Sequence, residues 1–286
     1  MSYGSPNWYS WLLSEEEGIK HIKAAYDAGI NTFDTADVYS NGLSEVILGK
    51  AIKQLDLPRE GIVVMTKFGG VVERTPDYAG PMYRNIGNAD NDGYVNQWGC
   101  SRKVMQALHD VVKAGYVRYI GMSSCYAWQF HVMQNYAINN NLTPFISMQD
   151  HHSLIYREEE REMFPSLKHF GVGAIPWSPL GRGLLCRPFG EQTARGNTDQ
   201  FSKAYTREST RAIVDRVEEV AKSKAISMAQ VALAWSLSKD PVCAPIIGTT
   251  SIDNLMDLIG AINVKLTEEE IKYLEEPYEP VQIIGH

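Results

Sequence analysis

Short runs of β-prone residues alternate with helical patterns along nearly the whole chain, and this alternation constrains the fold more than any other feature. Strands of this type pair in parallel, so the sequence predicts an α/β fold. Six runs predict strands, at residues 32–36, 62–67, 117–123, 145–149, 172–177 and 243–248. Helices are predicted at residues 14–29, 44–55, 103–114, 126–140, 157–169, 208–223, 228–238, 252–261 and 267–276.

Two of these helices carry a signal for their first turn. Ser14-Glu-Glu-Glu17 and Thr267-Glu-Glu-Glu270 place a glutamate three positions after a hydroxyl residue, which is the spacing of a capping box. Gly29 follows the first of these helices and predicts its end. We expect both hydroxyl side chains to bond to the backbone of their helices.

Length and charge restrict the class of protein. The chain has 286 residues, and a single barrel of alternating strands and helices takes about 250. The basic residues are scattered and the formal net charge is −7, which argues against a nucleic-acid partner. No apolar run is long enough to span a bilayer, and no secretory leader pattern is present. The four cysteines are far apart, so we expect a cytoplasmic protein with reduced thiols.

An acid, a phenol and an amine fall where two predicted strands end. Asp34 lies near the end of the strand at 32–36, and Tyr39 lies in the loop beyond it. Lys67 is the only cation in the run 62–68. In a parallel α/β fold these strand ends form the face that carries the chemistry.

The three side chains suit proton transfer. An ammonium beside a phenol favours the phenolate and lowers the pKa of the tyrosine, while a carboxylate keeps the lysine charged. Tyr39 is therefore predicted to donate a proton, assisted by Lys67 and Asp34. The residues alone leave open a plainer interpretation, in which they are a surface phenol, a solvated lysine and a capping acid. No pair of histidines has metal-binding spacing, and no metal site is predicted.

Residues 29–45 closely resemble the signature of the aldo-keto reductases. The chain looks most like their fungal aryl-alcohol dehydrogenase or versiconal hemiacetal acetate reductase branch. The resemblance implies a (β/α)8 TIM barrel and reduction of an aldehyde or ketone, with a hydride from NADPH and a proton from Tyr39. Further similarity lies at residues 117–124, 145–149, 175–184 and 246–251.

The resemblance also implies that the barrel is incomplete, because six predicted strands are two fewer than a closed barrel has. The first strand would lead into Met1-Ser-Tyr-Gly4. About forty further residues of the family, with the fourth strand, would lie between Lys103 and Val104. We expect one domain over residues 1–286 with an internal deletion at 103–104. The missing strand carries the histidine that orients the carbonyl in the family.

His151 and His152 follow the strand at 145–149 and so fall on the face that carries the chemistry. Relatives have an Asn-His-Tyr-like run at this place, so replacement of the missing histidine by His152 is the less favoured alternative. Four other histidines fall in helical patterns and are interpreted as surface or core residues. They are His21, His109, His131 and His169.

Cofactor positions follow from the resemblance. Asp34 is one of them. Ser123, Ser124 and Gln149 would hold the nicotinamide carboxamide, and Trp177 would stack on its ring. Residues of a loop over the pyrophosphate would be Ser178, Leu180, Gly181 and Arg182. Residues near the 2′-phosphate and adenosine, which favour NADP over NAD, would be Gly248, Thr249, Thr250, Ser251 and Asn254. Leu258 departs from the family here, since many members have an adenine-binding Asn at its position, and by itself the Gly-Thr-Thr-Ser run is equally a helix cap.

The sequence supports three hypotheses of function. The first is an NADP-dependent reductase of a small carbonyl compound, aryl or polyketide-derived, in secondary metabolism. The second is an impaired barrel that binds nucleotide or a partner without turnover, because the tetrad histidine is missing. The third is a truncated gene product. Residues 69–100 contain no periodic element and are interpreted either as a loop over the substrate entrance or as a surface excursion.

Overall fold

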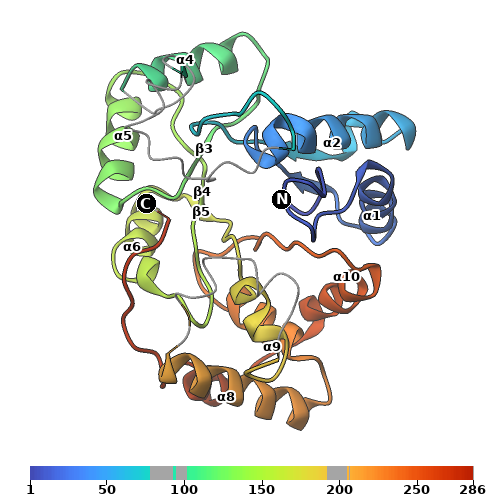
Figure 1. Cartoon of the computed structure of the whole chain (residues 1–286). Coiled ribbons are helices and arrows are strands. Elements are labelled where there is room, and N and C mark those ends of the chain that lie inside the picture. Colours follow the sequence, from blue (N-terminus) through green and yellow to red (C-terminus); the bar gives the residue numbers. More distant parts are fainter. Residues whose placement is uncertain (78–92, 95–101, 192–204, 206, 286) are drawn as a thin grey trace. The chain divides into compact units, whose positions relative to one another are not determined.

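The computed structural model describes residues 1–77, 93–94, 102–191, 205 and 207–285. The chain forms two compact units. The first unit comprises Met1–Cys100 and Gly248–Met256, and the second comprises Ser101–Ile247 and Asp257–His286. Helices and parallel strands alternate in the chain (Figure 1), which confirms the predicted α/β class. No described helix is both long enough and apolar enough to traverse a bilayer.

The first unit contains a two-stranded parallel sheet, in which Asp34 lies opposite Met65. Its first two helices pack closely, since a methyl group added at Gly18 would lie 3.3 Å from Cγ2 of Ile47. Its elements are α1 (Glu15–Asp27), β1 (Thr32–Asp34), η1 (Tyr39–Gly42), α2 (Leu43–Gln54), η2 (Arg59–Gly61) and β2 (Val63–Met65).

The second unit is built on a three-stranded parallel sheet in the order β3-β4-β5. Ser123 lies opposite Gln149, so two predicted cofactor residues share one sheet position. The helices α4, α5 and α6 follow one another along one side of this sheet (Figure 1). The elements up to β5 are α4 (Arg102–Lys113), β3 (Gly121–Ser123), α5 (Ala127–Asn139), β4 (Ser147–Gln149), η3 (Glu158–Glu160), α6 (Met163–Phe170) and β5 (Gly173–Ala174).

The rest of the second unit is helical. A core of fully buried side chains, among them Val217, Trp235 and Leu274, joins α8, α9 and α11. Another core, with Phe130, Met148 and Leu167, lies against the sheet. The remaining helices are η4 (Gly181–Cys186), α8 (Glu208–Lys224), α9 (Met228–Leu237), α10 (Ile252–Ile259), η6 (Gly260–Asn263) and α11 (Glu268–Glu275). Of these, α10 begins in the first unit and ends in the second.

The prediction of a strand at residues 243–248 is wrong. Residues 242–246 run parallel to residues 174–177 but form only isolated bridges, in which Ala174 pairs with Val242 and Trp177 with Ile246. Two prolines explain the interruption, because a proline has no backbone N–H to continue a ladder. One is Pro245 in the segment itself, and the other is Pro176 beside it.

Of the two predicted capping boxes, the one at Thr267 is present and the one at Ser14 is not. Thr267 and Glu270 form the expected capping box, with bonds to each other's backbone N–H of 3.2 and 2.8 Å. The prediction of a capping box at Ser14 is wrong, because the Ser14 side chain makes no capping hydrogen bond and the Glu17 carboxylate binds Lys20 at 2.8 Å.

The single helix predicted at 157–169 is divided into η3 and α6. Pro165 is the third residue of α6, and a proline is tolerated only in the first turn of a helix. The α-helix therefore begins at Met163 rather than continuing from the residues before it.

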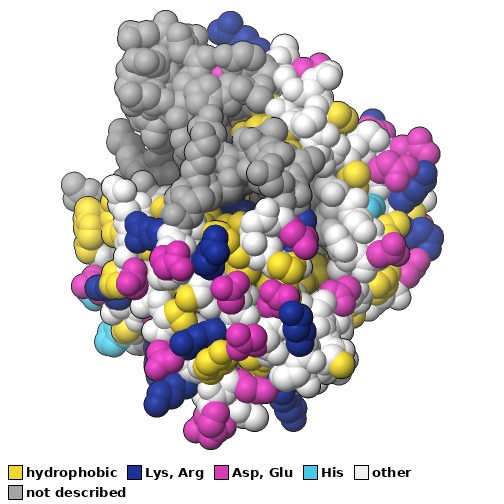
Figure 2. Space-filling model, turned by 60° about the horizontal axis from the view of Figure 1, so that its bottom comes forward, with side chains coloured by type: hydrophobic (Ala, Val, Ile, Leu, Met, Phe, Trp, Pro, Cys, Tyr) yellow, Lys and Arg dark blue, Asp and Glu magenta, His cyan; other side chains and the backbone are white. Residues whose placement is uncertain are grey.

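Acidic and basic side chains are interspersed over the described part of the face in Figure 2. This mixed pattern agrees with the scattered charges in the sequence.

Candidate active site

Asp34, Lys67 and Tyr39 lie together in the first unit. Nζ of Lys67 donates hydrogen bonds to both carboxylate oxygens of Asp34, at 2.8 and 2.7 Å. It also donates to the backbone oxygen of Thr35 at 2.7 Å. The same ammonium lies 5.2 Å from the ring centroid of Tyr39. The structure thus brings the three residues of the predicted proton-transfer group into one cluster.

The register of the sheet explains this convergence. Asp34 is the last residue of β1, and Lys67 follows the end of the neighbouring strand β2. A hydrogen bond of 3.1 Å from the Asp37 backbone N–H to the Lys67 carbonyl continues the pairing beyond the strands. Parallel strands bring their carboxyl ends to the same edge, so both side chains emerge there.

An unusual turn fixes the backbone next to Tyr39. Ser40 and Asn41 both adopt the left-handed conformation, with φ of 47° and 49°, and Gly42 follows with φ of 92°. Left-handed backbone is uncommon for residues other than glycine and concentrates where the surrounding structure enforces it. Buried Ser40 accepts a bond of 3.0 Å from the backbone N–H of Ser5, which holds the turn.

Burial and charge oppose each other at Lys67. Burial lowers the pKa of Lys67 from its ordinary value, and the charge and hydrogen bonds of Asp34 raise it again in part. Asp34 therefore sustains the ammonium in a place where its desolvation would otherwise favour the neutral amine.

Asp37 is an acid that the sequence reasoning did not single out. Burial raises the pKa of its carboxyl to about 6. Its position directly before the Tyr39 turn is the only sequence signal that could have drawn attention to it. A carboxyl with a perturbed pKa beside Lys67 adds a further titratable group to the cluster of Asp34, Tyr39 and Lys67.

In the second unit, the predicted carboxamide residues and Trp177 form another cluster. Ser123 Oγ donates to the Gln149 carbonyl at 2.9 Å. Trp177 Nε1 donates to Ser124 Oγ at 3.0 Å, which fixes one edge of the indole. Gln149 is buried and Trp177 is partly exposed. A flat ring with hydroxyl groups at its edge fits the nicotinamide end of a dinucleotide in chemical type.

The loop after Trp177 turns back sharply. Ser178 and Arg182 have left-handed backbone, with φ of 54° and 59°. A side chain at Gly181 would be strained, since φ is 55° and an added Cβ would lie 2.6 Å from Cδ1 of Ile155. Leu180 packs at the edge of the helical core. The guanidinium carbon of Arg182 lies 5.8 Å from the Trp177 ring centroid, so the loop brings a positive charge beside the indole.

The predicted phosphate residues lie at the start of α10, in the first unit. Thr249 Oγ1 accepts a bond of 3.1 Å from the backbone N–H of Ser251. Ser251 Oγ accepts one of 3.3 Å from the N–H of Asn254. Gly248 is close to Ser2, because an added Cβ would lie 3.0 Å from the Ser2 hydroxyl. Thr250 completes the segment. The first turn of a helix attracts anions, and the first turn of α10 also carries the acid Asp253.

His152 does not have the environment of a substitute catalytic histidine. Its side chain is fully buried, and Nε2 lies 2.8 Å from Oε1 of Glu160. Its ring stacks on Trp235 at 5.0 Å between centroids. Burial lowers the pKa of His152 despite the bond to Glu160. The hydrogen bond and the packing of His152 commit it to the interior, which agrees with the sequence-based expectation that its replacing the missing histidine is the less favoured alternative.

The other histidines have contacts typical of structural residues. His21 is buried, His109 Nδ1 lies 3.0 Å from Thr143 Oγ1, and His131 Nδ1 lies 3.1 Å from Nδ2 of Asn135. His169 packs against Phe170. No group of His, Cys, Asp or Glu side chains able to hold a metal ion occurs among the described residues.

Two buried acids behind β4 were also missed. Asp150 is fully buried, and burial together with the Glu159 charge holds its pKa well above the ordinary range. Burial likewise raises the pKa of Glu159 to about 7. Within the acidic run Glu158-Glu-Glu160, nothing in the sequence distinguishes the buried acid from the others.

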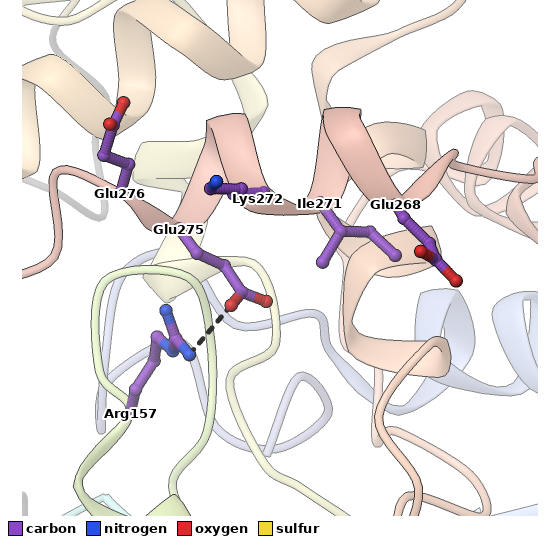
Figure 3. A pocket seen from close by; sticks show the side chains of 6 residues that line it. All are labelled: Arg157, Glu268, Ile271, Lys272, Glu275 and Glu276. Carbon is purple, nitrogen blue, oxygen red and sulfur yellow. Dashed lines mark hydrogen bonds and ion pairs between the residues drawn. The ribbon is translucent and has the colours of Figure 1, made fainter.

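A surface hollow of about 470 Å³ lies beside α11 (Figure 3). Its floor contains an ion pair of 3.0 Å between Arg157 and Glu275. Glu275 also accepts bonds from Trp235 Nε1 and Lys239 Nζ. None of the predicted site residues lines this hollow, and Glu276 at its edge pairs with Arg216, which is not among the lining residues. It is lined by Arg157, Glu268, Ile271, Lys272, Glu275 and Glu276.

The interpretation of residues 69–100 as an entrance loop concerns mainly residues outside the described part of the chain. Asn41 holds the beginning of that stretch, since its amide donates to the Thr75 carbonyl at 2.7 Å. Its Oδ1 also accepts a bond of 3.2 Å from the Glu73 N–H. The start of the long loop is therefore attached to the turn that carries Tyr39.

This chain belongs to the aldo/keto reductase family, whose model matches residues 1–90 and 88–279. Members of this family generally use NAD(P)H and act on small-molecule carbonyl substrates. The chain is similar to a versiconal hemiacetal acetate reductase of Aspergillus parasiticus, with 44% identity over 321 aligned positions that cover 99% of this chain and 93% of that protein. The resemblance seen in the sequence is thus confirmed.

Two further relatives are described as putative aryl-alcohol dehydrogenases. The one from Schizosaccharomyces pombe is 43% identical and covers 100% of this chain and 99% of its own length. The one from Saccharomyces cerevisiae is 39% identical and covers 98% of this chain and 92% of its own length.

The Aspergillus alignment has 321 positions against 286 residues in this chain, so at least 35 positions, the difference between the two, have no residue here.

Proposed function

We propose that this chain is an NADP-dependent reductase that converts an aldehyde or ketone to the alcohol. The observation that carries the proposal is the Lys67 ammonium, bound by both oxygens of Asp34 and lying 5.2 Å from the Tyr39 ring. This is a proton donor with a charge beside it and a carboxylate that maintains the charge. Membership of the aldo/keto reductase family supports the same chemistry.

Each residue of the cluster has a separate task. Tyr39 gives its hydroxyl proton to the carbonyl oxygen of the substrate. The Lys67 ammonium stabilises the phenolate that remains, because opposite charges attract strongly where water is partly excluded. Asp34 keeps Lys67 protonated against the effect of burial. NADPH, when bound, supplies the hydride that reaches the carbonyl carbon.

The residues of the second cluster are proposed to hold the nicotinamide end. Ser123, Ser124 and Gln149 offer hydroxyl and amide groups to the carboxamide, and Trp177 offers a flat face to the ring. The loop of Ser178, Leu180, Gly181 and Arg182 is proposed to cover the pyrophosphate.

The start of α10 supports NADP over NAD. The segment Gly248–Ser251 precedes Asn254 in the first turn, and backbone N–H groups with the positive end of the helix suit a 2′-phosphate. Direct measurement of the affinity ratio for NADPH over NADH tests this preference.

The family supports a (β/α)8 barrel, and we propose that this chain lacks part of it. The alignment positions without a residue here support an internal deletion, for which Lys103–Val104 is the proposed junction.

Relatives named as aryl-alcohol dehydrogenases and as a versiconal hemiacetal acetate reductase support an aryl or polyketide-derived carbonyl as the substrate. Cys186 and Cys243 are free thiols, which supports a cytosolic setting.

The same missing positions favour a second candidate function, a nucleotide-binding protein without turnover. Loss of one donor that orients the carbonyl costs about 10²-fold or more in rate. Binding of NADPH by the wild-type protein, without carbonyl-dependent oxidation for any aryl aldehyde or ketone tested, would favour this second function.

Tyr39→Phe tests the reductase. This change removes the hydroxyl and leaves the ring, so carbonyl-dependent oxidation of NADPH should fall at least about 10²-fold while NADPH affinity stays within about twofold. Tyr116→Phe is the matched control, since this side chain is 83% exposed. An unchanged rate in Tyr39→Phe would remove Tyr39 from the mechanism.

A further inference from the structure

Three aromatic rings behind the proposed cofactor cluster form one continuous stack. The His151 imidazole lies between the rings of Trp177 and Tyr156, with centroids 4.1 Å from each. The interplanar angles are 8° to Trp177 and 14° to Tyr156. His151 and Tyr156 are buried, whereas Trp177 is partly exposed. The stack therefore runs from the interior to an accessible indole.

The backbone fixes the order of the stack. His151 and Trp177 form a parallel bridge, and the Trp177 N–H donates to the Asp150 carbonyl at 2.7 Å. A hydrogen bond of 2.8 Å joins His151 Nε2 to the Tyr205 hydroxyl. The imidazole is thus confined by a ring on each face and a bond at its edge.

His151 in turn determines the plane of Trp177. A parallel contact at 4.1 Å covers one face of the indole, and the bond from Nε1 to Ser124 holds its edge. With one face covered, a nicotinamide ring can stack only on the other. An indole whose orientation is fixed before binding loses less conformational freedom when the cofactor arrives.

We propose that His151 is a positioning residue for the cofactor, which acts by holding the Trp177 indole in the plane that receives the nicotinamide ring. This inference rests on the proposed function, because it takes Trp177 as the stacking partner of NADPH. It assigns His151 no contact with the substrate or the cofactor.

The chain supplies a matched control in the next residue. His152 is also fully buried and also stacked on an indole, but its partner is Trp235, at 5.0 Å and 19°. Replacing either histidine by leucine removes a buried aromatic ring and a hydrogen bond. Only the His151 change removes the ring against Trp177, so only that change should affect the cofactor.

The experiment measures the NADPH dissociation constant by the fluorescence of the bound nucleotide, at a temperature where circular dichroism shows each variant to be folded. His151→Leu should raise the constant about 3- to 10-fold, the size expected for the loss of one aromatic pair. His151→Phe restores a planar ring and should return the constant to within about twofold of wild type. His152→Leu should lower the unfolding temperature while leaving the constant within about twofold.

A second readout needs no cofactor. The near-ultraviolet circular dichroism of the free protein should lose intensity in His151→Leu, since a less restrained indole gives a weaker signal, and His151→Phe should restore it. Wild-type affinity in His151→Leu would overturn this inference and leave the proposed function intact. An equal loss of affinity in His152→Leu would also overturn it. Failure of the wild-type protein to bind NADPH at millimolar concentration would overturn the proposed function, and the inference with it.

Discussion

Glu159→Gln should stabilise the protein, and more so as pH rises. Burial raises the pKa of Glu159 to about 7 from 4.5, so the folded state holds a proton that the unfolded state releases in this range. The contribution of the protonated acid to stability is complete below pH 4.5 and is lost as pH rises through 7. Glutamine resembles the protonated acid in shape and cannot ionise.

The size of the effect follows from the two pKa values. Moving a carboxyl pKa from 4.5 to about 7 changes the free energy of unfolding by about 3 kcal/mol between pH 4 and pH 8. Buried Asp150 shares the surroundings, and ionised Glu159 raises its pKa, so removal of the charge at 159 also relieves Asp150. We expect the variant to be about 1–3 kcal/mol more stable than wild type at pH 8 and nearly equal to it at pH 4.5.

Urea unfolding followed by far-ultraviolet circular dichroism at several pH values measures this difference. Glu160→Gln is the matched control with the opposite sign. Burial of Glu160 is outweighed by hydrogen bonds from His152 and Arg157, which lower the pKa of Glu160 to about 2. That variant should be less stable than wild type at pH 7. A Glu159→Gln protein no more stable than wild type at pH 8 would refute the reasoning.

Two further substitutions test the first unit. Gly4→Ala should destabilise the protein by about 1–3 kcal/mol in thermal unfolding, since the new Cβ would lie 2.0 Å from the Ser40 hydroxyl oxygen. Adding Ser40→Gly to this variant should recover much of the lost stability, because Ser40 has left-handed backbone. If Ser40→Gly restored none of the stability lost in Gly4→Ala, this account of the contact would be contradicted. Asp34→Asn should reduce the reduction rate and move the alkaline fall of the pH–rate profile to lower pH, because Lys67 loses the charge that raises its pKa against burial. An alkaline limb at its wild-type position would show that Lys67 does not govern it.

Local sequence patterns predicted the strand ends and the convergence of the side chains placed on them. Asp34 and Lys67 were expected to converge because each ends a short β-prone run, and parallel pairing then brings both to one edge. The capping box at Thr267 was also predicted, since its partners are three residues apart. These features depend on residues close in the chain or on a single pairing rule.

Features that depend on distant partners could not be predicted. Ser14 has the same capping pattern as Thr267, but its glutamate binds a lysine instead. His151 and Trp177 are separated along the chain, and only the pairing of their segments stacks them. The burial of Glu159 within an acidic run and the left-handed backbone at Ser40 depend on packing from other segments. Tertiary context decided each case, because propensity and spacing describe only neighbours.

The most direct test of the central claim uses NADPH in which both hydrogens at C4 are replaced by deuterium. The wild-type protein is incubated with this cofactor and an aryl aldehyde, and the alcohol is analysed by mass spectrometry. The account predicts an alcohol with one deuterium on the former carbonyl carbon, formed by wild type and almost absent with Tyr39→Phe. Bound NADPH without any labelled alcohol, across a panel of aryl aldehydes and ketones, would contradict the reductase and leave a nucleotide-binding protein.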